Sequence, residues 1–193
     1  MGESFHTSKK GIHASRKSIH AGKNNFQNSG RRCAILGMLL AVALLCSYVE
    51  SLIPFSFGIP GIKLGLANLV TVIALYRLGP KEALLISVAR ILLSGFLFGN
   101  MSAIVYSLAG GILSFLVMFF LKNVVKLNIL SVSGAGGIFH NLGQLFVAAL
   151  VVENLNLLYY MSILFFSGMV TGLLIGVAGR EVLKHLPAMA GKE

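Results

Sequence analysis

A single arginine interrupts the apolar stretch from Ala83 to Phe98. Arg90 lies near the middle of this stretch, where an arginine in a membrane helix costs about 2.5–3.5 kcal/mol on the insertion scale. Such a side chain should face protein or an aqueous pocket and should have a partner. Glu50, near the end of the first apolar stretch, is the nearest candidate in depth. Arg90 is therefore half of a structural Arg–Glu pair or a ligand-binding group, and the two roles are compatible.

A second polar group, the segment HNLGQ, lies near the predicted start of the fifth apolar stretch. Its polar residues are His140, Asn141 and Gln144, and His140 and Gln144 share a helix face because they are four residues apart. A histidine in this setting is either a hydrogen-bonded packing residue or a polar ligand contact. Metal binding is not expected, because no second histidine or carboxylate has suitable spacing.

The segment IPGIKLGLANL (59–69) separates the first two apolar stretches. Its proline and glycines oppose a continuous helix, so the segment should form an irregular loop before the second helix. Lys63 and Asn68 then fall in the first turns of that helix, where they could present positive charge and hydrogen bonds to an anionic ligand. The alternative for Lys63 is a lysine that extends to the membrane surface. Asn100, in the turn GNMS, joins the candidate ligand contacts.

The composition places these polar residues in a membrane protein. Of the 193 residues, 56% are hydrophobic and 11% are charged, whereas a soluble domain carries about 25% charged residues. Seven of the sixteen Lys and Arg residues lie within residues 1–32, and most others lie at the ends of apolar stretches. This distribution is typical of a multi-pass membrane protein and argues against a nucleic-acid partner, despite the net charge of +10.

Six membrane spans are predicted, with both termini in the cytoplasm. With this topology, 14 of the 16 Lys and Arg residues lie on the cytoplasmic side, as the positive-inside rule requires. The predicted fold is thus an all-α bundle of six transmembrane helices at 33–185. A basic, disordered cytoplasmic arm at 1–32, which could contact membrane lipid, precedes the bundle, and a short cytoplasmic tail at 186–193 follows it. The spans are Ala34–Ile53, Leu64–Leu78, Ala83–Phe98, Ala103–Leu121, Gly137–Val152 and Leu157–Val177.

Small residues indicate where these helices approach one another. The sixth span carries Gly168, Gly172 and Gly176, and the fourth is also rich in Gly, Ala and Ser, so both are expected to pack inside the bundle. The first span carries a stripe of Ala34, Gly37 and Ala41. This stripe could pack internally or contact a partner subunit.

Three long segments resemble one known family. PGIKLGLANLVTVIALYRLGPKEALLISVARILLSGFLFGN, YSLAGGILSFLVM and HNLGQL, within about residues 34–180, resemble the bacterial Gx transporter family, also called heptaprenyl diphosphate synthase component I. The resemblance implies a location in the bacterial cytoplasmic membrane and a fold like the substrate-capture (S) components of energy-coupling-factor transporters. It also implies that Gly37 and Ala41 dock a coupling subunit, and that a ligand lies near the outer face, beneath the loop Pro54–Lys63.

The synthase name can be tested against the acidic residues. Prenyl-chain elongation binds diphosphate through magnesium held by clustered aspartates, in keeping with the oxygen ligands that Mg²⁺ prefers. This chain has no aspartate, and its six glutamates form no pair: Glu3, Glu50, Glu82, Glu153, Glu181 and Glu193. It also has no nucleotide-binding loop of the G-x-x-x-x-G-K-[ST] type. The sequence therefore predicts neither a catalytic site nor a cofactor.

Two functions remain at this point, and a purely structural scaffold is the fallback. The first is a substrate-binding or transport subunit with an outward-facing pocket for a small, anionic molecule, working with a coupling subunit and ATPase subunits. The second is a non-catalytic membrane component that assists a separate prenyl diphosphate synthase chain.

Overall fold

The structure is a computed structural model that describes residues 30–52 and 65–185. Lys63, most of the predicted basic arm and the predicted tail lie outside these ranges. The chain divides into two compact units, Met1–Met38 and Leu39–Glu193. In the first unit the described residues, 30–38, are helical, and all the other described residues belong to the second unit.

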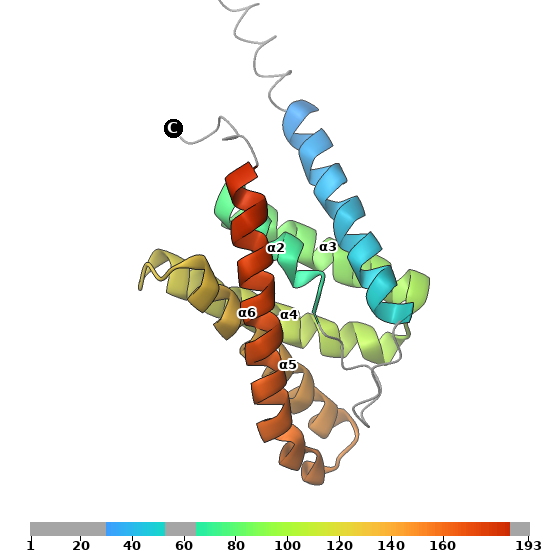
Figure 1. The fold of residues 1–193 in the computed structure, drawn as a ribbon. Coiled ribbons are helices and arrows are strands. Elements are labelled where there is room, and N and C mark those ends of the chain that lie inside the picture. Colours follow the sequence, from blue (N-terminus) through green and yellow to red (C-terminus); the bar gives the residue numbers. More distant parts are fainter. Residues whose placement is uncertain (1–29, 53–64, 186–193) are drawn as a thin grey trace, which may run out of the picture. The chain divides into compact units, whose positions relative to one another are not determined.

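The described residues form six α-helices and one 3-10 helix, without strands, which confirms the predicted all-α fold (Figure 1). Four helices are long and apolar enough to cross a membrane: Gly30–Leu52, α4, α5 and the continuous segment Leu155–His185. The first helix is Gly30–Leu52, followed by α2 (Asn68–Arg77), α3 (Pro80–Phe98), α4 (Met101–Asn123), α5 (Ile129–Val151), η1 (Leu155–Tyr160) and α6 (Met161–His185).

Two helices differ from these four. The helix α2 has only 10 residues. The helix α3 has 19 residues, but it carries Lys81, Glu82 and Arg90. Whether these two helices also cross the membrane therefore depends on how their polar residues are buried.

Asparagine side chains cap the N-terminal ends of several helices. Asn100 Oδ1 accepts a hydrogen bond from Ala103 N at 2.8 Å at the start of α4. Asn128 Oδ1 accepts one from Ser131 N at 2.9 Å at the start of α5. These bonds satisfy backbone N–H groups that lack a partner within the helix.

The start of α5 corrects one prediction. The fifth span was expected to begin near Gly137, after a Ser/Gly-rich passage, but the helix begins at Ile129. Besides the cap at Asn128, close contacts with neighbouring helices stabilise this passage: Ser133 Oγ donates to Gly172 O at 2.7 Å. Serine and glycine favour helix contact within a membrane bundle, although they disfavour an isolated helix in water.

The helix α5 packs mainly against α6 and α4 (Figure 1). A Cβ atom added to Gly137 would lie 2.2 Å from the carbonyl oxygen of Gly168, and one added to Gly143 would lie 2.9 Å from Gly110 Cα. Backbones approach so closely only because all four residues are glycines. The predicted internal packing of the small residues in α4 and α6 is confirmed.

Cationic side chains join the C-terminal ends of α2, α4 and α6. Arg77 Nη2 donates to Leu183 O at 2.5 Å. Lys122 Nζ donates to Leu75 O and lies 4.8 Å from the centre of the Tyr76 ring. Because cations near helix C-termini interact favourably with the helix dipole, these contacts fix the three ends together.

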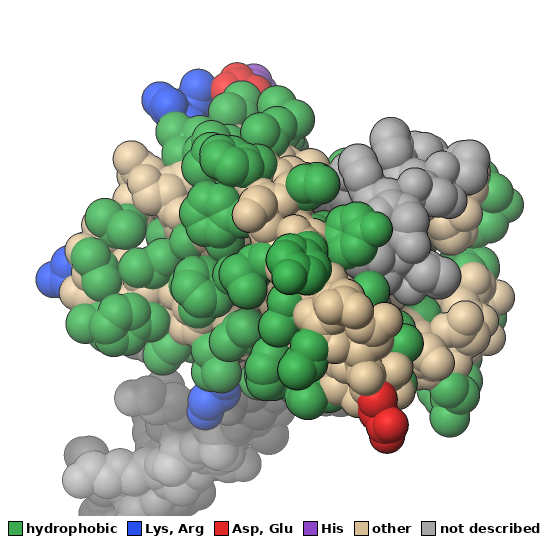
Figure 2. Space-filling view, turned by 90° about the horizontal axis from the view of Figure 1, so that it is seen from below, with side chains coloured by type: hydrophobic (Ala, Val, Ile, Leu, Met, Phe, Trp, Pro, Cys, Tyr) green, Lys and Arg blue, Asp and Glu red, His purple; other side chains and the backbone are tan. Residues whose placement is uncertain are grey.

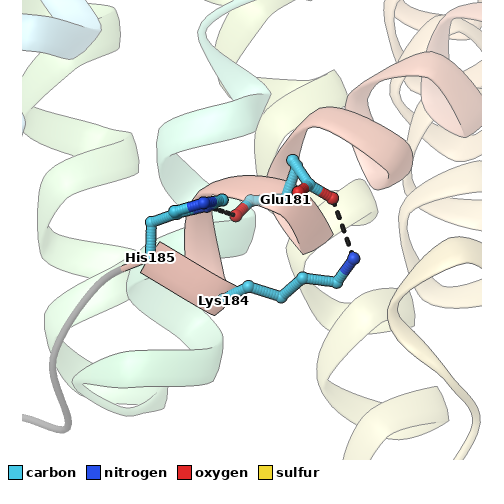
Figure 3. A network of polar contacts seen from close by, with 3 residues as sticks. All are labelled: Glu181, Lys184 and His185. Atoms are coloured by element: carbon cyan, nitrogen blue, oxygen red, sulfur yellow. Dashed lines mark hydrogen bonds and ion pairs between the residues drawn. The ribbon is translucent and has the colours of Figure 1, made fainter.

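The last turn of α6 carries an exposed polar network (Figure 3). Lys184 Nζ lies 2.9 Å from Glu181 Oε2, and His185 Nδ1 lies 3.0 Å from the carbonyl oxygen of Glu181. Exposed ion pairs of this kind contribute about 0–1 kcal/mol to stability. This network therefore marks a solvated helix end.

Large apolar side chains cover much of the outer surface. Figure 2 shows hydrophobic side chains over most of one face, with a few charged groups near its margins. Exposed members include Phe96, Leu116, Phe166 and Leu174. A soluble monomer rarely exposes such an extensive apolar surface. With the four long apolar helices, this surface is that of a multi-pass membrane protein.

Candidate functional site

The helix α2 is too short to cross a membrane by itself, and its first residue lies among the other helices. Ten residues of α-helix extend about 15 Å, about half of a hydrocarbon core of about 30 Å. The C-terminal end of α2 is held at the ends of α4 and α6, so its N-terminal end reaches only partway along them. Asn68, its first residue, is accordingly buried.

A glycine turn directs the chain into α2. Gly65 has a φ of 82°, which is unfavourable for residues with a side chain. Its carbonyl oxygen accepts a hydrogen bond from Asn68 N at 2.8 Å. A Cβ atom added to Gly65 would lie 3.4 Å from Asn68 Nδ2 and 3.9 Å from His140 Cδ2. The turn therefore brings the start of α2 to His140, at the middle of α5.

Arg90, at the middle of α3, reaches the same place. Its side chain is 5% exposed, and its Nη2 atom lies 3.4 Å from Asn68 Oδ1, a long hydrogen bond. Its Nε atom is buried and has no hydrogen-bond partner among the described residues. A guanidinium has five N–H donors, so this arginine is only partly satisfied.

Glu50, near the end of the first helix, provides the negative charge of this site. Its Oε1 atom accepts a hydrogen bond from Gly65 N. Glu50 is also buried and interacts electrostatically with Arg90. The structure describes no direct ion pair between these two residues; Glu50 contacts the backbone before α2, and Arg90 contacts the first side chain of α2.

The predicted polar residues of α5 do not all lie at this site, because one of them instead joins α5 to a neighbouring helix. His140 lies at the middle of the helix rather than near its start, because α5 begins earlier than predicted. Asn141 Nδ2 donates to Leu164 O at 3.0 Å and so joins α5 to α6. Gln144 is 1% exposed, and neither its Oε1 nor its Nε2 atom has a hydrogen-bond partner among the described residues.

A cavity of about 10 Å³ lies beside the start of α2. Asn68, Ser133, His140 and Asn141 provide polar side chains to its wall. A cavity of this size is close to the smallest that holds one water molecule. Asn68 is the residue that this cavity shares with the contact of Arg90, and neither Arg90 nor Glu50 lines it.

The other predicted residues lie elsewhere. Asn100 caps α4, as described above. Ala41 is exposed in the second unit, whereas Ala34 and Gly37 belong to the helical segment of the first unit. Within residues 30–52 and 65–185, no three His, Cys, Asp or Glu side chains lie close enough to hold a metal ion.

Three polar groups near the site were not predicted: the Gly65 N–H, Ser47 and Thr71. Ser47 and Thr71 are buried, and their hydroxyl oxygens have no hydrogen-bond partner among the described residues. Spacing gives a signal for both, since Ser47 is three residues from Glu50 and Thr71 is three residues from Asn68, which places each pair on one helix face. The role of the Gly65 N–H has no such signal in the sequence.

These groups bring charged and polar atoms together at the start of α2. They combine one arginine, one carboxylate and the amide of Asn68 with the positive N-terminal end of α2. Hydrogen bonds between charged partners in such a buried setting are stronger than those between neutral groups.

Comparisons with known proteins identify one matching family. The family model for heptaprenyl diphosphate synthase component I matches residues 39–182. Neither the search of curated proteins nor the search of solved structures found a match. The matched range includes Glu50, Asn68, Arg90 and all of α2–α5. The chain belongs to the heptaprenyl diphosphate synthase component I family.

Proposed function

We propose that this protein is a substrate-binding subunit of a membrane transporter, with an outward-facing pocket for a small anionic molecule. One observation carries the proposal: Arg90, buried among apolar helices, has an unpartnered Nε atom beside the first residue of a half-length helix. Ionisable residues within membrane segments are costly and commonly mark the path or site of a ligand. Transporters also use the N-terminal ends of interrupted helices to bind anionic substrate groups.

The proposed topology has six crossings, with both termini in the cytoplasm of a bacterium. In this arrangement the C-terminal ends of α2, α4 and α6 all face the cytoplasm. The contacts of Arg77 and Lys122 support it, because they hold these three ends together. The helix α3 crosses the membrane with Arg90 turned inward, and α2 crosses together with the chain that precedes it. Residues 33–185 form the membrane domain, between a cytoplasmic arm at 1–32 and a tail at 186–193.

Energy for transport must come from another chain, because this sequence has no nucleotide-binding loop of the G-x-x-x-x-G-K-[ST] type. We place a transmembrane coupling subunit on the first helix, at Ala34, Gly37 and Ala41. Small residues allow a partner helix to approach closely within the membrane. The coupling subunit would in turn bind ATPase subunits.

The family name favours a second candidate. A component of heptaprenyl diphosphate synthase could assist a separate catalytic chain at the membrane. The absence of aspartate from this sequence assigns the magnesium–diphosphate chemistry to that other chain. In this case the buried site would bind no transported molecule.

Native mass spectrometry of the protein extracted gently from its own membranes tests the proposal. A transport subunit should carry a bound small molecule and co-purify with ATPase subunits. Arg90→Gln should lose the small molecule, whereas Arg180→Gln, a matched change at an exposed arginine, should retain it. Co-purification of a prenyl diphosphate synthase chain, without a bound small molecule, would overturn the transport proposal and support the second candidate.

A further inference from the structure

A carboxylate of the protein itself already lies at the start of α2. Glu50 Oε1 accepts a hydrogen bond from the N–H of Gly65, in the turn that leads into the helix. Glu50 belongs to a different helix and is 6% exposed, so this contact is a buried tertiary interaction. The N-terminal end of a helix favours negative charge, because its N–H groups and its dipole point toward the anion.

The guanidinium of Arg90 lies at the same position and retains capacity to donate. Its Nη2 atom lies 3.4 Å from Asn68 Oδ1, and the guanidinium as a whole interacts electrostatically with Glu50. Its Nε–H is buried and has no partner among the described residues. An arginine fork bound to a carboxylate through two parallel hydrogen bonds would use this free donor. Neither Glu50 nor Asn68 uses it in this conformation.

The charges of the described residues at this site favour an anion with a single charge. Among the described residues at the start of α2, Arg90 is the cation and Glu50 is the anion. A ligand carboxylate at the position of Glu50 would place the same single negative charge beside Gly65 N–H and Arg90. A diphosphate would add further negative charge, which proteins commonly neutralise with magnesium or with additional cations.

We propose that the group recognised on the ligand is a single carboxylate, and that it binds at the position that the carboxylate of Glu50 occupies in this structure. The ligand carboxylate displaces Glu50, accepts the hydrogen bond from Gly65 N–H and receives the free Nε–H of Arg90. This inference rests on the proposed function and assigns the ligand to the carboxylic acids.

Chemical rescue tests the inference. Glu50→Ala in the full-length protein leaves the Gly65 N–H and Arg90 without the internal carboxylate. Formate or acetate should then stabilise the purified protein in a saturable manner, raising its Tm by about 3 °C or more at ten times the Kd. Sodium chloride at equal ionic strength should not do so, and sodium diphosphate should do no better than chloride. The unchanged protein should respond little, because Glu50 occupies the position.

The controls make each outcome decisive. Glu181→Ala, which removes an exposed carboxylate from α6, should show no specific effect of acetate. Glu50→Gln, which keeps the size of the side chain, should show a weaker rescue than Glu50→Ala.

If Glu50→Ala folds only when it is prepared in acetate, the proposal is supported. Failure of Glu50→Ala to fold even in acetate, or an equal effect of chloride, overturns the proposal. So does stronger stabilisation by diphosphate. These failures would leave the native mass spectrum of the unchanged protein unaffected, so they can be told apart from failure of the transport proposal.

Discussion

Adding one methyl group at the crossing of α5 and α6 should strongly destabilise the bundle. In Gly137→Ala, the new Cβ atom would lie 2.2 Å from the carbonyl oxygen of Gly168 and 2.9 Å from Gly172 Cα. The first distance is about 1.2 Å shorter than ordinary van der Waals contact, which begins at 3.4 Å. Both neighbouring atoms belong to the backbone, so the two helices must separate. Overpacking of this kind costs about 3 kcal/mol at the upper end of its usual range.

The higher helix propensity of alanine opposes part of this cost. Replacing glycine by alanine within a helix gains about 1 kcal/mol, so the expected net loss is about 2 kcal/mol. The assay is unfolding of the purified protein by SDS in mixed micelles, followed by circular dichroism. Gly179→Ala is the matched control on α6, because its nearest neighbours would lie at 3.6 Å. Equal unfolding curves for Gly137→Ala and Gly179→Ala would refute the close backbone crossing.

Three further predictions concern the topology, a partner and a helix cap. In a cysteine-free background, a cysteine at Ser102 should react with an impermeant reagent added outside, whereas one at Lys81 should not; labelling at Lys81 would refute the topology. Gly37→Leu combined with Ala41→Leu should abolish co-purification of a coupling subunit while the protein remains folded; misfolding of the isolated double variant would assign the stripe to internal packing. Asn128→Ala should lower the free energy of unfolding by about 1 kcal/mol, since it removes the cap of α5, and an unchanged SDS unfolding curve would contradict this role.

The helical architecture could be predicted because the lengths and hydrophobicity of the apolar stretches determine it. The fourth span was predicted at Ala103–Leu121, and the helix found there is Met101–Asn123. The start of α5 could not be predicted in the same way. Its Ser/Gly-rich beginning has low helix propensity, and the contacts with α4 and α6 that stabilise it are tertiary.

The burial of Arg90 could also be expected, because a charge within an apolar stretch is costly where it faces lipid. Its contact with Asn68 could not, since this contact depends on the turn at Gly65 and on the shortness of α2. Sequence reasoning considered Glu50 as a partner for a cationic side chain. The structure shows Glu50 bound to a backbone N–H, a donor that is present at almost every residue and therefore has no sequence signature.

The most direct test of the account is the affinity of the Arg90 site for the small molecule recovered from the native protein. Equilibrium binding of that molecule should be compared among the unchanged protein, Arg90→Gln and Arg180→Gln, each shown to be folded by circular dichroism. Loss of a buried charge-assisted contact should weaken binding to Arg90→Gln at least about tenfold, or about 1.4 kcal/mol, while Arg180→Gln binds like the unchanged protein. Equal affinity of all three would contradict the central claim that the buried guanidinium at the start of α2 recognises the ligand.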